Sequence, residues 1–211
     1  ETLSLIEEFE YRVRKGTAYY ELKSYKDAMN YLEPAVAVLN DKKSFLELNA
    51  KNKGYPDDKV DGLGLWALET LADVYKITGE QIKISFNSSN IKIAEEQFEL
   101  KAYYYVKAQD AYIEVLRQDD RDAASKGLYM IGELYERAYD ELWNTPVPDD
   151  IIKQKLERMY KDNLKNILRS LLEKSKTAHK KNIEYAVTYK IENAWVEKSR
   201  VALERIKKRS S

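Results

Sequence analysis

Small and large side chains alternate at helical spacing near the start of the chain, and this feature constrains the fold most. Residues 16–36 have the sequence GTAYYELKSYKDAMNYLEPAV. The small positions are Gly16, Ala28 and Ala35, and the large positions beside them are Tyr19, Tyr25 and Leu32. Two helices that cross closely need small residues where their backbones approach and large residues to fill the space beside them. The stretch therefore predicts a tightly crossed helix pair.

Apolar residues recur every three or four positions along the rest of the chain, as in helices with one buried face. This periodicity predicts helices at 4–22, 25–39, 63–78, 91–117 and 123–143. Asp149 or Asp150 is the expected N-cap of a long sixth helix, which a break near residues 190–193 separates from a last helix. The connectors 40–62 and 79–90 are predicted to be inserted loops. With only 7 Gly and 4 Pro, the chain has too few turn residues for an all-β fold, and we expect an all-α fold.

Composition excludes several classes of protein. Hydrophobic residues make up 44% and charged residues 34% of the chain, so neither a disordered chain nor a membrane protein is expected. No apolar run approaches the roughly 18 residues of a spanning helix. The absence of cysteine excludes disulfides and thiolate metal sites. The sequence begins with Glu1 rather than Met, so a signal peptide or lipid anchor upstream would not be visible.

Charge is balanced overall but unevenly distributed. Residues 151–211 hold 17 Lys or Arg and 7 Asp or Glu, which leaves 19 basic and 29 acidic residues among the first 150. The two parts therefore carry about +10 and −10. Such asymmetry is typical of lysine-rich solvated helix faces, of an acidic partner at the C-terminal end, or of two halves that attract each other.

The small and large positions of the opening stretch resemble the tetratricopeptide repeat, a helix–turn–helix unit of 34 residues. The pattern recurs more weakly around Ala72 and Tyr75, and again around Gly132 and Tyr135. These copies are spaced more widely than the family's repeat, so the resemblance implies expanded repeats. It implies stacked antiparallel helix pairs in a single domain over 1–211, with about three repeats in 4–143 and C-terminal capping helices in 149–208.

The first helices of stacked tetratricopeptide repeats line a concave groove that binds peptides or helices of partner proteins. Carried over by position, the resemblance implies a groove formed by Val13, Thr17, Tyr20, Glu21, Trp66, Glu69, Asp73, Lys76, Tyr129, Glu133, Glu136 and Arg137. Acidic side chains at these positions repel a peptide carboxylate and suit a basic or aromatic segment. We expect Glu69, Asp73, Glu133 and Glu136 to form an acidic strip that holds a basic helix. That helix is either the chain's own C-terminal cap or part of a partner. The alternative to a fully open groove is one in which the cap covers some of these positions.

No catalytic residue, metal site or cofactor site is expected. His179 is the only histidine, and its setting KTAHKKN predicts an exposed basic face without a nucleophile beside it. The segment DDKVDG departs from a calcium loop at Lys59 and Leu68, and no phosphate-binding glycine loop is present. Nucleic-acid binding is not expected, because the chain lacks a continuous basic track.

These observations favour a non-catalytic scaffold of tetratricopeptide type that binds a protein partner. A different class stays open: a small-ligand-binding or enzymatic helical domain with an aromatic pocket around Trp66, Tyr103, Tyr104 and Tyr105. A self-assembling structural protein is a third reading. The looser likeness to bacterial repeat proteins of the cell envelope favours the periplasm or envelope over the cytoplasm. The oligomeric state is not fixed by the sequence.

Overall fold

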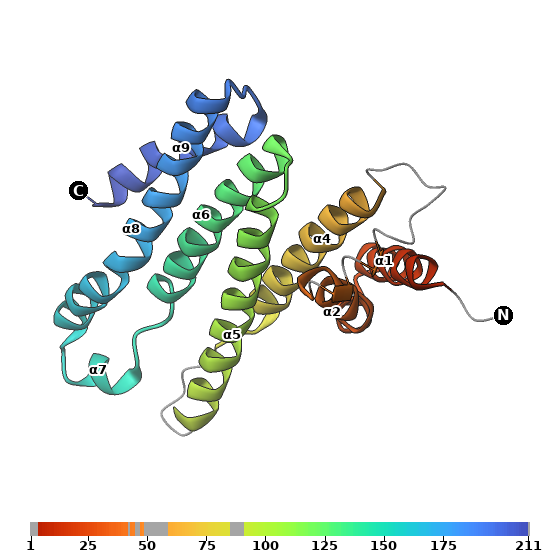
Figure 1. The fold of residues 1–211 in the computed structure, drawn as a ribbon. Coiled ribbons are helices and arrows are strands. Elements are labelled where there is room, and N and C mark those ends of the chain that lie inside the picture. The colour runs from red at the N-terminus through yellow and green to blue at the C-terminus, as the bar shows by residue number, and fades with distance from the viewer. Residues whose placement is uncertain (1–3, 42, 45–46, 49–58, 85–90, 211) are drawn as a thin grey trace.

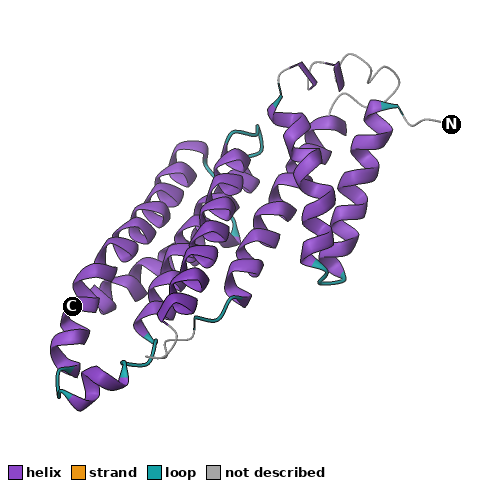
Figure 2. Ribbon diagram, turned by 90° about the horizontal axis from the view of Figure 1, so that it is seen from below, coloured by secondary structure: helices purple, strands orange, loops and turns teal. Residues whose placement is uncertain are grey.

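Helices account for the regular structure of the chain in a computed structural model, which describes residues 4–41, 43–44, 47–48, 59–84 and 91–210 (Figures 1 and 2). The described part of the chain contains no strand, so the all-α prediction is confirmed. The helices are α1 (Leu5–Glu21), α2 (Tyr25–Asn40), α4 (Lys59–Gln81), α5 (Ile91–Leu116), α6 (Arg121–Trp143), α7 (Asp149–Lys153), α8 (Glu157–Tyr189) and α9 (Ala194–Ser210). Among the described residues, no helix combines the length and the hydrophobicity needed to cross a bilayer.

Local sequence signals account for where several helices begin. Ser4 caps α1, because its hydroxyl accepts from the Glu7 amide while the Glu7 carboxylate accepts from the Ser4 amide. The Asp120 carboxylate caps α6 by accepting from the Ala123 amide at 2.8 Å. Such caps satisfy amide groups that have no partner inside the helix.

Successive helices pack against one another along the chain. The long helices form the neighbouring pairs α1–α2, α2–α4, α4–α5, α5–α6, α6–α8 and α8–α9, and α1–α4 and α6–α9 are also in contact. Figure 1 shows the resulting row of helices, with α1 and α2 at one end and α8 and α9 at the other. Chain neighbours are therefore also spatial neighbours.

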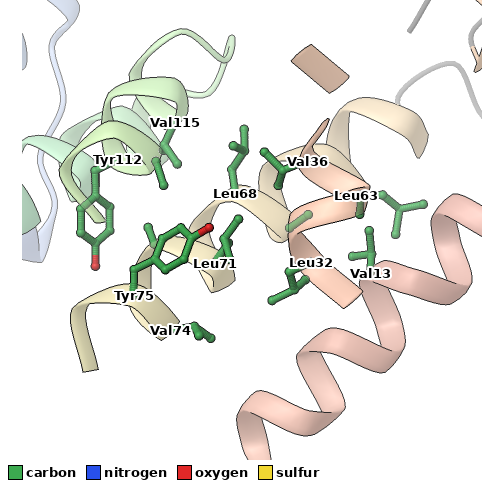
Figure 3. Packing of buried hydrophobic residues seen from close by; sticks show 14 of the residues in the cluster. Val13, Leu32, Val36, Leu63, Leu68, Leu71, Val74, Tyr75, Tyr112 and Val115 are labelled. Carbon is green, nitrogen blue, oxygen red and sulfur yellow. The ribbon is translucent and has the colours of Figure 1, made fainter. Parts of the chain in front are cut away.

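The crossing of α1 and α2 is as close as the sequence predicts. A Cβ atom placed on Gly16 would lie 2.5 Å from the Leu32 Cγ atom, and Ala28 has no exposed surface. Leu32 and Val13 belong to an apolar cluster that continues through α4 to Tyr75 and, on α5, to Tyr112 (Figure 3). The rings of Tyr75 and Tyr112 fill space in this cluster, and their hydroxyls donate to Glu33 and Asp73 at its edge.

The prediction of one long helix from residue 149 or 150 is wrong. The chain forms the short helix α7, breaks at Lys155 with a left-handed φ of 56°, and starts again as α8. Pro148 is the N-cap residue of α7, while Asp149 and Asp150 lie in its first turn. The break near residue 190 is confirmed, since Lys190 is left-handed with a φ of 55°.

Two connectors are only partly described. Helix α4 begins at Lys59, four residues earlier than the periodicity predicts, so the end of the 40–62 connector is helical. Helix α4 also continues to Gln81, and residues 82–84 have no regular structure. Residues 43–44 and 47–48 of the first connector are also helical, and Leu48 is fully buried in the apolar cluster, so the loop prediction is wrong there too. The predicted loop positions 42, 45–46, 49–58 and 85–90 lie outside the described residues.

The expected exposed position of His179 is also wrong. Its side chain has no exposed surface and lies between α6 and α9. Four further polar residues are fully buried beside it: Ser125, Ser175, Asn182 and Ser199. Lysines on both sides of His179 in the sequence suggest an exposed face, but they point away from this buried side of α8 and are exposed or half-buried.

Candidate functional site

An apolar groove runs over α6 between the walls formed by α5 and α8. Its cavity volume is about 360 Å³. In Figure 1, α6 lies between these two helices, and it packs against both. The floor consists of Leu134, Tyr135, Ala138, Glu141 and Leu142 of α6, and Ile84 lies at one end.

The two walls expose large apolar side chains. Phe98 and Val106 of α5 are 44% and 56% exposed, and Ile167 of α8 is 70% exposed. Phe98, Ala102 and Val106 follow one another at four-residue spacing, so they form one stripe on α5. A rimmed apolar patch on a folded chain is typical of a surface that binds another molecule.

One end of the groove contains a buried lysine whose charge is fully satisfied. The Lys101 ammonium donates to the carbonyls of Gly79 and Ile82 at 2.9 and 3.0 Å and forms an ion pair with Glu141 at 2.7 Å. Since an ammonium has three donors, these three acceptors leave none for a ligand. Lys101 instead binds the carbonyl end of α4, where a positive charge is favourable. Nearby, burial and the Glu141 carboxylate raise the pKa of Tyr105, whose hydroxyl donates to Glu141.

The polar groups at the other end are also paired. The Tyr135 hydroxyl donates to the Gln109 side chain, and the Lys174 ammonium lies 5.2 Å from the centre of the Tyr135 ring. Burial is the main cause of the raised pKa of Tyr135, with a contribution from Asp110. The surface that the groove offers to a ligand is therefore mostly apolar.

The inner-face residues implied by the repeat resemblance lie on α1, α4 and α6, but most of their charges are already paired. Ion pairs join Glu69, Lys76 and Glu80 of α4, in that order, to Lys126, Glu133 and Arg137 of α6. The same order on both helices means that α4 and α6 run parallel. Asp73 accepts from the Tyr112 hydroxyl at 2.6 Å, and its charge contributes to the raised pKa of Tyr20, after the larger effect of burial.

Glu136 of the expected acidic strip is covered by the chain's own last helix. It is only 3% exposed, and Arg205 of α9 holds both carboxylate oxygens at 2.5 and 2.7 Å. Arg209 adds a third hydrogen bond at 2.8 Å and an ion pair to Asp140. The basic helix that contacts this acidic position is therefore the chain's own α9.

The remaining predicted groove residues fall into two groups. Thr17 is buried and bonds to the Val13 carbonyl, and Tyr129 packs against Trp195 with ring centres 5.5 Å apart. Glu21 and Trp66 are exposed. The structure therefore leaves only part of the predicted inner face free.

The aromatic residues proposed as a pocket are not gathered in this groove. Tyr105 borders the groove, whereas Trp66, Tyr103 and Tyr104 are not part of its lining. Tyr104 packs on Tyr103 and Tyr75 with ring centres 5.3 and 6.3 Å away. Within the described ranges, no three histidine or acidic side chains gather closely enough to hold a metal ion.

A larger hollow of about 620 Å³ lies along α9. All its lining residues belong to that one helix, and Glu197, Arg200, Glu204, Arg205, Lys208 and Arg209 make it charged. A hollow with one charged wall is solvated surface rather than an enclosed site. The groove over α6 is thus the stronger candidate.

Sequence reasoning missed this groove, although one signal locates its buried lysine. Ala94, Lys101, Ala108 and Val115 recur every seven residues on α5, and all four are buried. Lys101 thus occupies a core position in an otherwise apolar line.

Comparison with protein-family models finds no match to this chain, and comparison with curated protein sequences finds none either.

Proposed function

We propose that this protein is a non-catalytic helical scaffold of tetratricopeptide type that binds the apolar face of a partner helix in the α5–α6–α8 groove. The observation that carries the proposal is the groove's open apolar lining, with Phe98, Val106 and Ile167 exposed on opposite walls. A helix with apolar residues at successive turns fits such a surface, because its anchors repeat at the spacing of the α5 stripe.

The pairing of the groove's polar groups supports this proposal over a small-molecule or catalytic site. Ligand and active sites present polar groups that converge on the ligand. Here Lys101 and Glu141 form an ion pair with each other, and the Tyr135 hydroxyl donates to Gln109, so the apolar side chains are what the groove offers to a ligand. Binding through the inner face is less favoured, since Glu136 and the α4–α6 ion pairs are already occupied.

The proposal can be tested by selecting displayed helical peptides on the folded full chain. Enriched peptides are then measured against Val106→Glu and Ile167→Glu, which place a charge on each groove wall. The matched controls are Val201→Glu on α9 and Val187→Glu on α8, whose valines are 55% and 73% exposed outside the groove. We expect amphipathic peptides whose affinity falls at least about tenfold, or ~1.4 kcal/mol, in the groove variants.

A different selection result would contradict the proposal. Peptides that bind both groove variants as well as the wild type do not use this surface. If the same peptides lose affinity in Glu69→Lys or Glu133→Lys, the inner face binds the partner instead.

A further inference from the structure

The groove's two walls carry opposite charges. On α5, Glu95 and Glu99 flank the stripe formed by Phe98, Ala102 and Val106, and both are exposed. On α8, Lys174 and Lys181 are exposed two turns apart, and Lys174 borders the groove. Among the described residues, none of these four side chains forms an ion pair with an opposite charge.

Helix α5 also exposes more apolar surface than the groove alone explains. Among the residues of this helix whose side chains are described, five large hydrophobic ones are exposed: Ile93, Phe98, Leu100, Tyr103 and Val106. At about 100° per residue, Phe98 and Val106 lie on the groove side of α5, Ile93 and Leu100 lie on roughly the opposite side, and Tyr103 lies between them. An amphipathic helix normally buries its apolar residues against another element. The same helix is therefore both a wall of the groove and an unpartnered apolar edge with an acidic flank.

From these observations we propose that the groove binds α5 of a second copy of this chain, in a two-fold symmetric dimer. This inference rests on the proposed function and names the partner helix. Each α5 would lie between α5 and α8 of the other copy, giving the order α8, partner α5, α5, partner α8 across the interface. This arrangement is self-complementary, as a two-fold interface requires.

The chemistry of the stripe fits this packing. With the two α5 helices antiparallel, Ala102 lies near the symmetry axis, and its small side chain lets the helices approach closely. Phe98 of each copy then packs beside Val106 of the other. The acidic flank of each α5 then lies along the basic edge of the other copy's α8, with Glu95 closest to Lys174, which lies beside Tyr135 and Gln109, and with Lys181 farther along the same edge. The same complementarity holds for the whole chain, where residues 1–150 carry about −10 and residues 151–211 about +10.

Sedimentation and light scattering of the full chain, from about 1 to 100 μM, test the dimer directly. We expect a mass that rises from monomer to dimer with concentration, by mass action. Val106→Glu should weaken the dimer at least about tenfold, while the equally exposed Val201→Glu leaves it unchanged. Circular dichroism melting curves show whether each variant is folded.

Charge reversal identifies the contact between α5 and α8. Glu95→Lys with Glu99→Lys, and separately Lys174→Glu with Lys181→Glu, should each weaken the dimer, and most at low salt. All four changes in one chain should restore it. A folded chain that stays monomeric throughout, a dimer insensitive to Val106→Glu, or failure of the combined variant to recover overturns the inference. A monomer that still selects helical peptides sensitive to Val106→Glu overturns the dimer alone and leaves the proposed function standing.

Discussion

The crossing of α1 with α2 and the crossing of α6 with α8 share a geometry but differ in chemistry. In both, a glycine lets a large side chain lie against the opposite helix: Leu32 at Gly16, and the His179 ring at Gly132, each 2.5 Å from where a Cβ would stand. The first crossing belongs to the apolar cluster. The second joins a buried polar seam.

This polar seam consists of Ser125, Ser175, His179, Asn182 and Ser199, and it connects α6, α8 and α9. Asn182 is at its centre: Ser125 donates to its oxygen at 2.9 Å, and its nitrogen donates to Ser199 and to the Trp195 carbonyl. Apolar contacts tolerate changes of shape, whereas a buried polar network fixes one arrangement because each lost partner leaves a group unsatisfied. These polar groups therefore hold α9 in one register against α6 and α8.

The largest expected difference between the two crossings comes from swaps that roughly conserve volume. Asn182→Leu removes the hydrogen bonds of Asn182 with Ser125, Ser199 and the Trp195 carbonyl, so three buried polar groups each lose one partner, although Ser125 keeps Asn193 and Ser199 keeps His179. We expect a loss of about 4 kcal/mol in the free energy of unfolding. Leu32→Met keeps the apolar crossing intact and should cost less than about 1.5 kcal/mol. Urea denaturation of both variants measures the difference. Equal losses would remove the distinction between the crossings.

Acid should destabilise the seam and spare the apolar crossing. Burial lowers the pKa of His179 to about 4, while Glu136 and Glu133 on α6 oppose this shift and Arg205 on α9 adds to it. No described residue bonds to the His179 Nε2 atom, so a proton there would be buried without an acceptor. An unfolded histidine has a pKa near 6.5, and the unfolded chain therefore binds the extra proton first.

The stability that neutral His179 contributes is present above about pH 6.5 and is lost as the pH falls toward about 4, amounting to about 3 kcal/mol. Denaturation at several pH values, in the wild type and in His179→Gln, measures this contribution. The variant should show a flatter profile in that window. Parallel profiles would assign the acid sensitivity to other groups.

Gly132→Ala probes the close approach within the seam. Its new methyl group would press on the His179 Cε1 and Nε2 atoms, and we expect a loss of about 2 kcal/mol through overpacking. Gly62→Ala is the matched control, because it lies in α4 with no atom within 4 Å of the new Cβ. That control should instead stabilise the helix by about 0.5–1 kcal/mol. Melting temperatures that fall for Gly132→Ala and rise for Gly62→Ala would support the close contact. An unchanged melting temperature for Gly132→Ala would refute it.

The smallest expected effect belongs to the ion pairs between α4 and α6. Glu69→Ala removes the pair with Lys126, whose side chain and that of Glu69 are both about a quarter exposed, and should cost about 0.5 kcal/mol. Added salt should erase this difference. A loss as large as that of Asn182→Leu would mean that the partly exposed pairs hold the helices as firmly as the buried seam.

Part of this arrangement was predictable from spacing. The periodicity located the described long helices to within a few residues, except at the break between α7 and α8. Gly16 and Ala28 were correctly placed at a close crossing, because small residues at helical spacing allow two helix backbones to approach. The recurrence of Lys101 with Ala94, Ala108 and Val115 every seven residues was not among the predictions, although it could have located this buried position.

Other features depend on partners far away in the chain. Glu136 has the sequence context of an exposed inner-face residue, yet Arg205 and Arg209 bury it from another helix. His179 stands among lysines, and only the docking of α9 and the gap at Gly132 enclose it. The groove exists because no other helix fills the space between α5 and α8. A local sequence pattern cannot predict such a gap, because it depends on where distant helices pack.

The sequence by itself determined that this protein is all-α, where most helices lie and which glycines allow close crossings, because periodicity and side-chain size act within a few turns of one helix. Only the tertiary structure decided which charges are paired, which polar residues are buried and which apolar surface stays open. Those outcomes depend on the distance and solvent exposure between groups on different helices. They are fixed only when the helices have packed.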